Sequence, residues 1–389
     1  MAVFKVLTLN NISVAGLEKL PRDGYEVASE IQNPDAIILR SYKMHDMDVP
    51  ESLQCIGRAG AGTNNIPVSK MSGLGIPVFN APGANANAVK ELVIAGMIQS
   101  SRNICQAWNY TANLSGDDVV LNKAVEQGKK DYAGFELAGK TLGVIGLGAI
   151  GRLVANAAEA LGMKVLGFDP GITVQGAWQL SSTVEQASSV DDLLSRVDFV
   201  TFHVPLIDAT KNMINAERIK LMKPTATVLN FARGGIVDDQ AVCDALDAGN
   251  LHAYVTDFPT NLVKDNAKVI AWPHLGASTV EAEDNCAIMV ADQIREYLES
   301  GNIRNSVNFP NTYMPRAKGP RLAVTNRNVP NVVGQITTKL ADAEINICDL
   351  INKSMGDYAY TLADLDGEIS EETMADIQSI DGVLRVRVL

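Results

Sequence analysis

Three glycines after a short apolar run constrain the fold of this chain more than any other feature. The run at 142–145 has the length of a buried strand, and Gly146, Gly148 and Gly151 follow it directly. A stretch with small and apolar residues at helical spacing comes next, and then a second apolar run that ends at Asp169. This order of strand, glycine-rich turn, helix and strand is typical of the first βαβ unit of a doubly wound α/β domain.

The same glycines predict a ligand. Gly146 permits a tight turn, Gly148 lets backbone N–H groups approach a diphosphate, and Gly151 lets helix and sheet pack closely. The diphosphate would lie at the positive N-terminus of the helix. Asp169, 18 residues after Gly151, is placed to accept hydrogen bonds from the adenosine ribose, and its charge would repel a 2′-phosphate. We therefore predict that the cofactor is NAD rather than NADP.

Length and charge narrow the class of protein further. A chain of 389 residues suggests two or three domains, and 47% hydrophobic residues with 5% aromatic residues indicate globular domains with aliphatic cores. The net charge of −12 argues against a surface for nucleic acid, so a phosphate-bearing ligand would need a local basic pocket.

Several absences in the sequence bear on location and cofactors. The chain has no apolar run of about 18 residues and no signal-peptide pattern, so we expect no membrane partner and a cytoplasmic protein. The five cysteines are scattered singly, as is typical of reduced, buried cysteines. Because His, Cys and Asp show no metal-ligand spacing, we predict no metal.

The strand pattern predicts two α/β domains. Four more β-length apolar runs follow Asp169, which makes six strands, and we assign residues 100–285 to an NAD-binding Rossmann domain. The first 99 residues repeat a smaller strand and helix alternation without the glycine pattern. Long helical patterns at 86–108 and 279–300 would carry the chain out and back. We therefore expect a discontinuous, flavodoxin-like substrate-binding domain made of residues 1–99 and 286–310.

A third domain is predicted at the end of the chain. Residues 311–320 contain two prolines and a glycine and read as a linker. Residues 321–389 show the order strand, helix, two strands, helix, strand, which is a ferredoxin-like βαββαβ unit. A sheet of this size that stays half exposed would gain from pairing with another copy, which favours a homo-oligomer, a dimer or a tetramer.

Two residues at predicted strand ends could carry chemistry. Arg233 lies just past a buried strand and before two glycines, where its guanidinium could hold a carboxylate in a bidentate grip. His274 follows another strand, and imidazole suits the removal of a hydroxyl proton at neutral pH. The alternatives are an ion-pairing Arg233 and a helix-capping His274. His203, after a third strand, is a rival base, although Pro205 suggests a loop on the cofactor side.

Six segments together resemble the D-isomer-specific 2-hydroxyacid dehydrogenases. The resemblance covers nearly the whole chain and implies an NAD-dependent oxidoreductase. The segments are IGRAGAGTNNI at 56–66, GIPVFNAPGANANAVKELVI at 75–94, ELAGKTLGVIGLGAIG at 136–151, HVPL at 203–206, NFARGGIVDD at 230–239 and PHLGAST at 273–279.

The resemblance implies a role for individual residues. Arg233 would bind the substrate carboxylate and His274 would be the general base. Arg40 and Arg58 would face a substrate phosphate, with the backbone of Gly60, Ala61 and Gly62 near the carboxylate, whereas ordinary surface ion pairing is the alternative for each arginine. The family's NAD-contacting positions, besides the three glycines, are occupied here by Ala149, Ile150, Asp169, Val204, Phe231 and Asp257.

The implied substrate is D-3-phosphoglycerate, oxidised to 3-phosphohydroxypyruvate in the first step of L-serine biosynthesis. The phosphorylated substrate is suggested by IGRAGAGTNN, by FNAPGANAN and by the tail. A glyoxylate or hydroxypyruvate reductase is the alternative within the same class. A protein that senses NAD(H) and acts through partner contacts, like the family's corepressors, is the alternative from another class.

One position departs from the family. The resemblance implies a catalytic glutamate that pairs with the histidine, but this chain has Asn261 there, and an asparagine cannot stabilise an imidazolium as a carboxylate does. Asp257 or Asp265 could substitute, or His274 could act without an acidic partner. A catalytic role for Lys264 or Lys268 also stays open.

The tail resembles ACT regulatory domains. Asn326, Asn328 and Asn346 fall near positions that bind serine in related domains, so L-serine is a possible effector by resemblance. A purely oligomerising role for this domain is the alternative.

Overall fold

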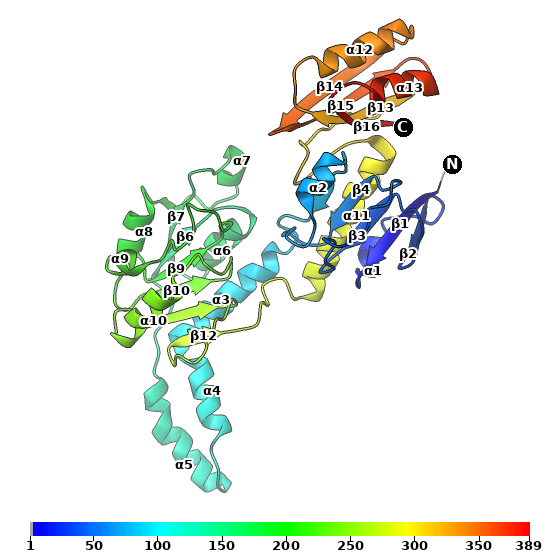
Figure 1. Ribbon diagram of the computed structural model, residues 1–389. Coiled ribbons are helices and arrows are strands. Elements are labelled where there is room, and N and C mark those ends of the chain that lie inside the picture. The colour runs from blue at the N-terminus through cyan, green and yellow to red at the C-terminus, as the bar shows by residue number, and fades with distance from the viewer. Residues whose placement is uncertain (1–2) are drawn as a thin grey trace. The chain divides into compact units, whose positions relative to one another are not determined.

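The computed structural model describes residues 3–389, and the chain divides into two compact units. Unit 1 holds the chain up to Asn85 together with Val280–Leu389, and unit 2 is Ala86–Thr279. The boundaries expected from sequence, at 99/100 and 285/286, differ from these because each would cut a helix. Helix α3 (Ala86–Arg102) belongs wholly to unit 2 and helix α11 (Val280–Ser300) wholly to unit 1. Figure 1 shows the elements of both units.

Unit 2 contains a parallel seven-stranded sheet in the order β12-β11-β10-β9-β6-β7-β8. This is the doubly wound order of a Rossmann domain, which confirms the predicted fold class. The sequence pattern missed only the two-residue edge strand β8. The strands are β6 (Thr141–Ile145), β7 (Lys164–Phe168), β8 (Glu185–Gln186), β9 (Phe199–Phe202), β10 (Thr227–Asn230), β11 (Ala253–Thr256) and β12 (Val269–Ala271).

Helices cover both faces of this sheet. Apolar side chains of α3 and α6 (Ala149–Ala160) pack on one face. Those of α8 (Val190–Arg196), α9 (Ala216–Ile219) and α10 (Asp239–Asp247) pack on the other. Because both faces are buried, the central strands are mostly apolar, and further polar residues follow them at their carboxyl ends.

Two further helices extend from unit 2 as a hairpin-like arm (Figure 1). The predicted helix at 86–108 breaks at Asn103, whose φ of 51° is left-handed. The chain continues as α4 (Ile104–Ala112), α5 (Asp118–Gly128) and a 3₁₀ turn (Lys129–Tyr132). The arm is held by its own contacts, including a hydrogen bond of 2.8 Å from the Tyr110 hydroxyl to the Ala124 carbonyl.

The first part of unit 1 is a parallel five-stranded sheet in the order β2-β1-β3-β4-β5. This is the flavodoxin-like order that was predicted. Helix α2 (Val68–Gly73) packs on one face. The long α11 packs on the other, with the short α1 (Val14–Leu17) against it. The strands are β1 (Phe4–Leu9), β2 (Tyr25–Ala28), β3 (Ala36–Leu39), β4 (Cys55–Arg58) and β5 (Val78–Asn80).

The end of the chain forms the predicted ferredoxin-like unit. Its antiparallel sheet has the order β14-β15-β13-β16, and α12 and α13 cover one face. The elements are β13 (Arg321–Arg327), α12 (Val332–Asp342), β14 (Ile347–Met355), β15 (Tyr358–Leu365), α13 (Glu371–Gln378) and β16 (Val383–Val388).

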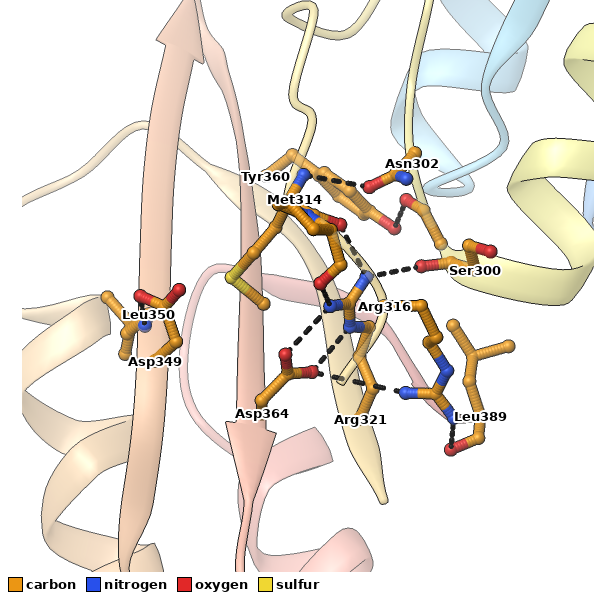
Figure 2. Close-up of polar contacts among 12 residues, drawn as sticks. Ser300, Asn302, Met314, Arg316, Arg321, Asp349, Leu350, Tyr360, Asp364 and Leu389 are labelled. Carbon is orange, nitrogen blue, oxygen red and sulfur yellow. Dashed lines mark hydrogen bonds and ion pairs between the residues drawn. The ribbon is translucent and has the colours of Figure 1, made fainter. Parts of the chain in front are cut away.

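The second face of this sheet packs on the rest of unit 1. Ala323, Tyr360 and Leu362 join the apolar core around α11. The buried Arg321 guanidinium also points toward the backbone carbonyls of Ser300 and Met314 (Figure 2). The same chain therefore covers the middle of this face, whereas the edge strand β14 has no buried residue. The expectation of a half-exposed sheet holds only at that edge. The predicted linker is likewise packed, since Thr312 and Met314 within 311–320 are buried.

Candidate active site

The glycine-rich turn in unit 2 has the geometry that a diphosphate requires. Gly146 adopts a φ of 91°, and a Cβ there would lie 2.6 Å from the His203 carbonyl oxygen. A Cβ on Gly151 would collide with the Gly146 carbonyl oxygen. Gly148, by contrast, faces open space and is the N-cap of α6, with no side chain capping the helix. The exposed N–H groups at Gly148 and Ala149 therefore form a backbone cradle that a side chain would fill, and the residues fit NAD.

Asp169 follows β7 and is fixed against this turn. Its Oδ2 accepts the Leu147 N–H at 2.8 Å and its Oδ1 accepts the Gly171 N–H at 2.8 Å. The carboxylate thus lies beside the glycine-rich turn. Val204 also lies at this turn, because its side chain is 2.8 Å from the position of a Cβ on Gly146.

Ile150 and Phe231 occupy different surroundings. Ile150 is half-buried in the first turn of α6. Phe231 is buried, stacks on Trp272 with ring centroids 5.7 Å apart, and packs against α3 at Gly96. The side chain of Phe231 is therefore part of the core under the sheet edge.

Arg233 lies on a loop that a buried asparagine holds in shape. Asn230, the last residue of β10, is 1% exposed. Its side-chain oxygen accepts the Ala232 N–H at 3.2 Å and its Nδ2 donates to the Arg233 carbonyl at 2.9 Å. The Arg233 side chain is exposed, and its Nη1 donates to the Ala232 carbonyl at 2.7 Å. An exposed guanidinium on a fixed backbone suits the binding of a carboxylate.

His274 lies on the loop after β12, at the same edge of the sheet. Its exposed ring contacts Phe258, with centroids 4.6 Å apart. Asp257, just after β11, is buried, and its Oδ2 accepts the Gly276 N–H at 3.1 Å. Burial raises the pKa of Asp257, while the Gly276 hydrogen bond and the charge of His274 act to lower it. The structure therefore brings His274 and Asp257 together.

The other candidates near His274 lie apart from it or are engaged elsewhere. Asn261 is exposed, and Asp265 is exposed and pairs with Lys264 at 3.4 Å. Lys268 donates to the Leu246 carbonyl at 2.6 Å. The rival base His203 has a buried Nδ1, and burial lowers its pKa to about 3, so this ring stays neutral near neutral pH.

Unit 1 brings two arginines together at the carboxyl ends of adjacent strands. Arg40 follows β3, and Arg58 ends β4 and donates from Nε to the Arg40 carbonyl at 3.1 Å. A Cβ on Gly60, whose φ is 155°, would collide with the Arg58 guanidinium. Ala61 and Gly62 continue this loop, and Asn80 Nδ2 donates to the Ala61 carbonyl at 2.6 Å. The predicted basic pocket and its glycine loop are thus one local structure.

A carboxylate on α11 partly neutralises this pocket. Glu283 lies 2.5 Å from Arg40 Nη1. Burial raises the pKa of the nearby Cys286 thiol, while the charges of Arg58 and Arg40 lower it and that of Glu283 raises it. Two cations and one anion therefore lie close together, and the pocket keeps an excess of positive charge.

Comparison with known proteins identifies the family. Residues 94–276 match the D-isomer specific 2-hydroxyacid dehydrogenase, NAD binding domain. A D-3-phosphoglycerate dehydrogenase of Escherichia coli strain K12 is 31% identical over 99% of this chain and 97% of its own length. The chain belongs to the D-isomer specific 2-hydroxyacid dehydrogenases. It is therefore an NAD-dependent dehydrogenase, which confirms the predicted class and cofactor.

Two further relatives support the family assignment. A D-3-phosphoglycerate dehydrogenase of Methanocaldococcus jannaschii is 38% identical over 84% of this chain, but the match spans 61% of that longer relative. The crystal structure of an NAD⁺-bound 3-phosphoglycerate dehydrogenase of Entamoeba histolytica has 26% sequence identity and a TM-score of 0.61. The structural alignment covers 80% of this chain and 100% of the Entamoeba histolytica chain.

Sequence reasoning missed two residues of this family member's site. Asn230 reads as one more polar residue at a strand end, and only its two backbone partners show that it shapes the Arg233 loop. Glu283 is far from Arg40 in the sequence and meets it only because α11 crosses the unit 1 sheet. No motif signals either contact.

The three asparagines of the proposed effector site do not converge within one chain. Asn326 pairs with Ala359 at one end of β15, whereas Ile347, next to Asn346, pairs with Leu365 at the other end. These β15 positions are six residues apart, or about 20 Å along a strand. Asn328 lies with Asn326, since its Nδ2 donates to the Gly356 carbonyl at 3.0 Å.

Asp169 gives a direct test of cofactor choice. We expect Asp169→Ala to raise the KM for NADH by about tenfold to a hundredfold, because a charge-assisted hydrogen bond is worth about 1.5–3 kcal/mol. The KM for NADPH should rise much less, since the charge that repels a 2′-phosphate is lost. Steady-state kinetics with both cofactors measure this, and Asp191→Ala, an exposed partner of Arg218, is the control. An unchanged preference for NADH would contradict the role.

Proposed function

We propose that this dehydrogenase oxidises D-3-phosphoglycerate to 3-phosphohydroxypyruvate, the first step of L-serine biosynthesis. The observation that carries the proposal is the local pair of Arg40 and Arg58 beside the glycine loop in unit 1. A 2-hydroxy acid without a second anionic group offers these two guanidinium groups no ionic partner. The names of the relatives from Escherichia coli and Methanocaldococcus jannaschii support the same substrate.

The proposed roles follow from the chemistry of each side chain. Arg233 binds the substrate carboxylate, supported by the backbone of Gly60, Ala61 and Gly62, and Arg58 with Arg40 binds the phosphate. His274 takes the proton of the C2 hydroxyl during oxidation and returns it during reduction. When bound, NAD accepts the hydride from C2. Gly146, Gly148, Ala149, Ile150 and Gly151 would hold its diphosphate, Asp169 its ribose, and Val204, Phe231 and Asp257 the remaining contacts.

The test is steady-state reduction with NADH of 3-phosphohydroxypyruvate beside hydroxypyruvate, glyoxylate and 2-oxoglutarate. We expect a clear preference for the phosphorylated acid. Arg58→Ala should lower kcat/KM for that acid by about a hundredfold and for hydroxypyruvate only slightly, because a charged hydrogen bond contributes about 1.5–3 kcal/mol. Equal loss on both substrates would remove the phosphate role from Arg58.

The ion pair of Arg40 with Glu283 favours a second candidate. A guanidinium that already has a carboxylate partner at 2.5 Å offers less to a phosphate. A glyoxylate or hydroxypyruvate reductase would need neither arginine for the phosphate. Turnover of the unphosphorylated acids at least as fast as of 3-phosphohydroxypyruvate would select this candidate, and NADH binding without turnover would select an NAD(H) sensor.

We propose that a second copy of this chain covers the α4–α5 arm. None of the nine residues of α4 is buried. Trp108 is 71% exposed, and Val119 on α5 is 79% exposed. We expect light scattering to give at least twice the 41.6 kDa of the chain. The variant Trp108→Glu/Val119→Glu should shift the mass toward 41.6 kDa, and a wild-type monomer would contradict the proposal.

Regulation and location are further proposals. We propose L-serine as an effector through the ACT-like domain, with Asn326, Asn328 and Asn346 as its contacts. These asparagines lie apart within one chain. The proposal therefore requires that Asn346→Ala and Asn326→Ala, each tested singly, lose the inhibition of the dehydrogenase by serine.

Among residues 3–389, the structure has no helix with the length and hydropathy of a membrane span. We propose a cytoplasmic location, where the five unpaired cysteines would stay reduced.

A further inference from the structure

Asp257 is a buried carboxylate at the edge of the unit 2 sheet that holds His274. It is the first residue after β11, which is paired on both sides with β10 and β12, and it is 1% exposed. Burying a carboxylate costs free energy unless hydrogen bonds or an opposite charge compensate for it. A functional role would explain why a carboxylate is buried at this position.

The two oxygens of Asp257 differ in their surroundings. Oδ2 accepts the Gly276 N–H at 3.1 Å, and Gly276 lies two residues beyond His274. This hydrogen bond ties the loop that carries His274 to the end of β11. Oδ1 is buried and makes no hydrogen bond of good geometry among residues 3–389, although the backbone N–H groups of Asp257 and Leu275 lie near the carboxylate and act to lower its pKa. One oxygen thus fixes the loop, and the other stays available to a group at the site.

The residue after Asp257 also supports His274. Phe258 contacts the imidazole ring, and its own backbone N–H is held by the Thr256 hydroxyl at 3.0 Å. The end of β11 therefore positions the imidazole in two ways, through the Phe258 ring and through the Gly276 hydrogen bond. The negative charge of Asp257 lies at the same end of the strand.

We propose that Asp257 is the positioning residue that orients His274 and stabilises its protonated form, in place of the carboxylate missing at Asn261. The inference rests on the proposed role of His274 as the acid and base. In reduction, the imidazolium proton goes to the C2 oxygen as hydride reaches C2, and His274 becomes neutral. Asp257 exchanges no proton in this step. It acts through its charge, which interacts with that of His274, and through its hydrogen bond to the Gly276 N–H.

The other charged groups near this end of the sheet do not substitute for Asp257. Asp239 accepts the Thr260 hydroxyl at 2.8 Å. The buried Tyr254 phenol interacts with Asp257 and Asp239, and burial raises its pKa to about 12, so it stays neutral. Arg233 carries a positive charge and cannot stabilise an imidazolium. Asp257 is therefore the carboxylate that the described structure places with His274.

The experiment is an NMR titration of the His274 imidazole in wild type and in Asp257→Asn. The chain has only 4 histidines, and His274→Gln assigns the signal. Asparagine keeps an acceptor for the Gly276 N–H, removes the charge and replaces the other oxygen with an NH2 group. A neighbouring carboxylate favours the imidazolium, so we expect His274 in the variant to titrate about one pH unit lower or more. The titration does not require turnover. It therefore tests the pairing of Asp257 with His274 even if the proposed reaction is wrong.

A kinetic test follows from the same expected shift of the His274 titration to lower pH. Reduction needs the imidazolium, so its rate falls as pH rises through the titration of His274, and this fall should move to lower pH in Asp257→Asn. At pH 8 we expect kcat in Asp257→Asn to be about tenfold lower than in wild type. Asp265→Asn, an exposed carboxylate on the preceding loop, is the matched control and should change neither.

Two results would overturn the inference. One is an unshifted His274 titration in Asp257→Asn, whatever the rate. The other is a loss confined to the Kd for NADH, which would assign Asp257 to the cofactor alone. If wild type turns over no 2-hydroxy acid but the titration shifts, the pairing of Asp257 with His274 stands and the proposed reaction falls.

Discussion

Replacing His274 with alanine should lower kcat for the reduction of 3-phosphohydroxypyruvate by about a hundredfold to ten-thousandfold, the usual contribution of a positioned acid or base. The variant loses the group that we propose delivers the proton, whereas the glycine-rich turn and Asp169, our proposed cofactor contacts, are untouched. The ring is exposed, so its removal opens no cavity in the core. Steady-state kinetics at saturating NADH measure the effect.

The control for this prediction is His45→Ala, which removes an exposed imidazole from unit 1 and should leave kcat unchanged. NADH binding measured by fluorescence should be unchanged in both variants. If His274→Ala keeps a turnover close to wild type, the histidine is not the acid or base, and the proton must come from another group or from water.

The local geometry of the cofactor site could be predicted because single residues determine it. A left-handed φ at Gly146 and the close approach of Gly151 to Gly146 leave no room for a Cβ, so the sequence must show glycine there. Asp169 falls at the end of the next strand by spacing alone. Strand ends likewise placed Arg233 and His274 at one edge of the sheet.

The contacts that depend on packing between distant segments could not be predicted. Asp257 interacts with Gly276, and Arg40 with Glu283, only because separate loops or a crossing helix bring them together. Apolar periodicity shows that a sheet face is buried but not what covers it. For that reason the ACT-like sheet was expected to gain from pairing with another copy, although its own chain covers the middle of that face.

The second large effect concerns the buried ion pair that attaches the ACT-like domain (Figure 2). Arg321 is 0% exposed, and its Nε and Nη2 donate to Asp364 at 2.5 and 2.8 Å. Its remaining N–H groups donate to the carbonyls of Ser300, Met314 and Pro315 at 2.7–3.0 Å. One side chain thus joins the end of α11, the segment before β13 and the sheet itself.

Arg321→Met should therefore destabilise unit 1 by about 3–5 kcal/mol, because it removes both hydrogen bonds that Arg321 donates to the buried Asp364 and leaves that carboxylate only Arg316, at 3.9 Å. For a unit of this size we expect the Tm to fall by about 10 °C in calorimetry. Arg321→Met/Asp364→Leu should recover much of the loss, since no unpaired charge remains. Arg304→Met, which removes an exposed arginine 3.8 Å from the half-buried Glu296, should change the Tm little. If the double variant is as unstable as the single one, the carbonyl contacts rather than the ion pair hold the domain in place.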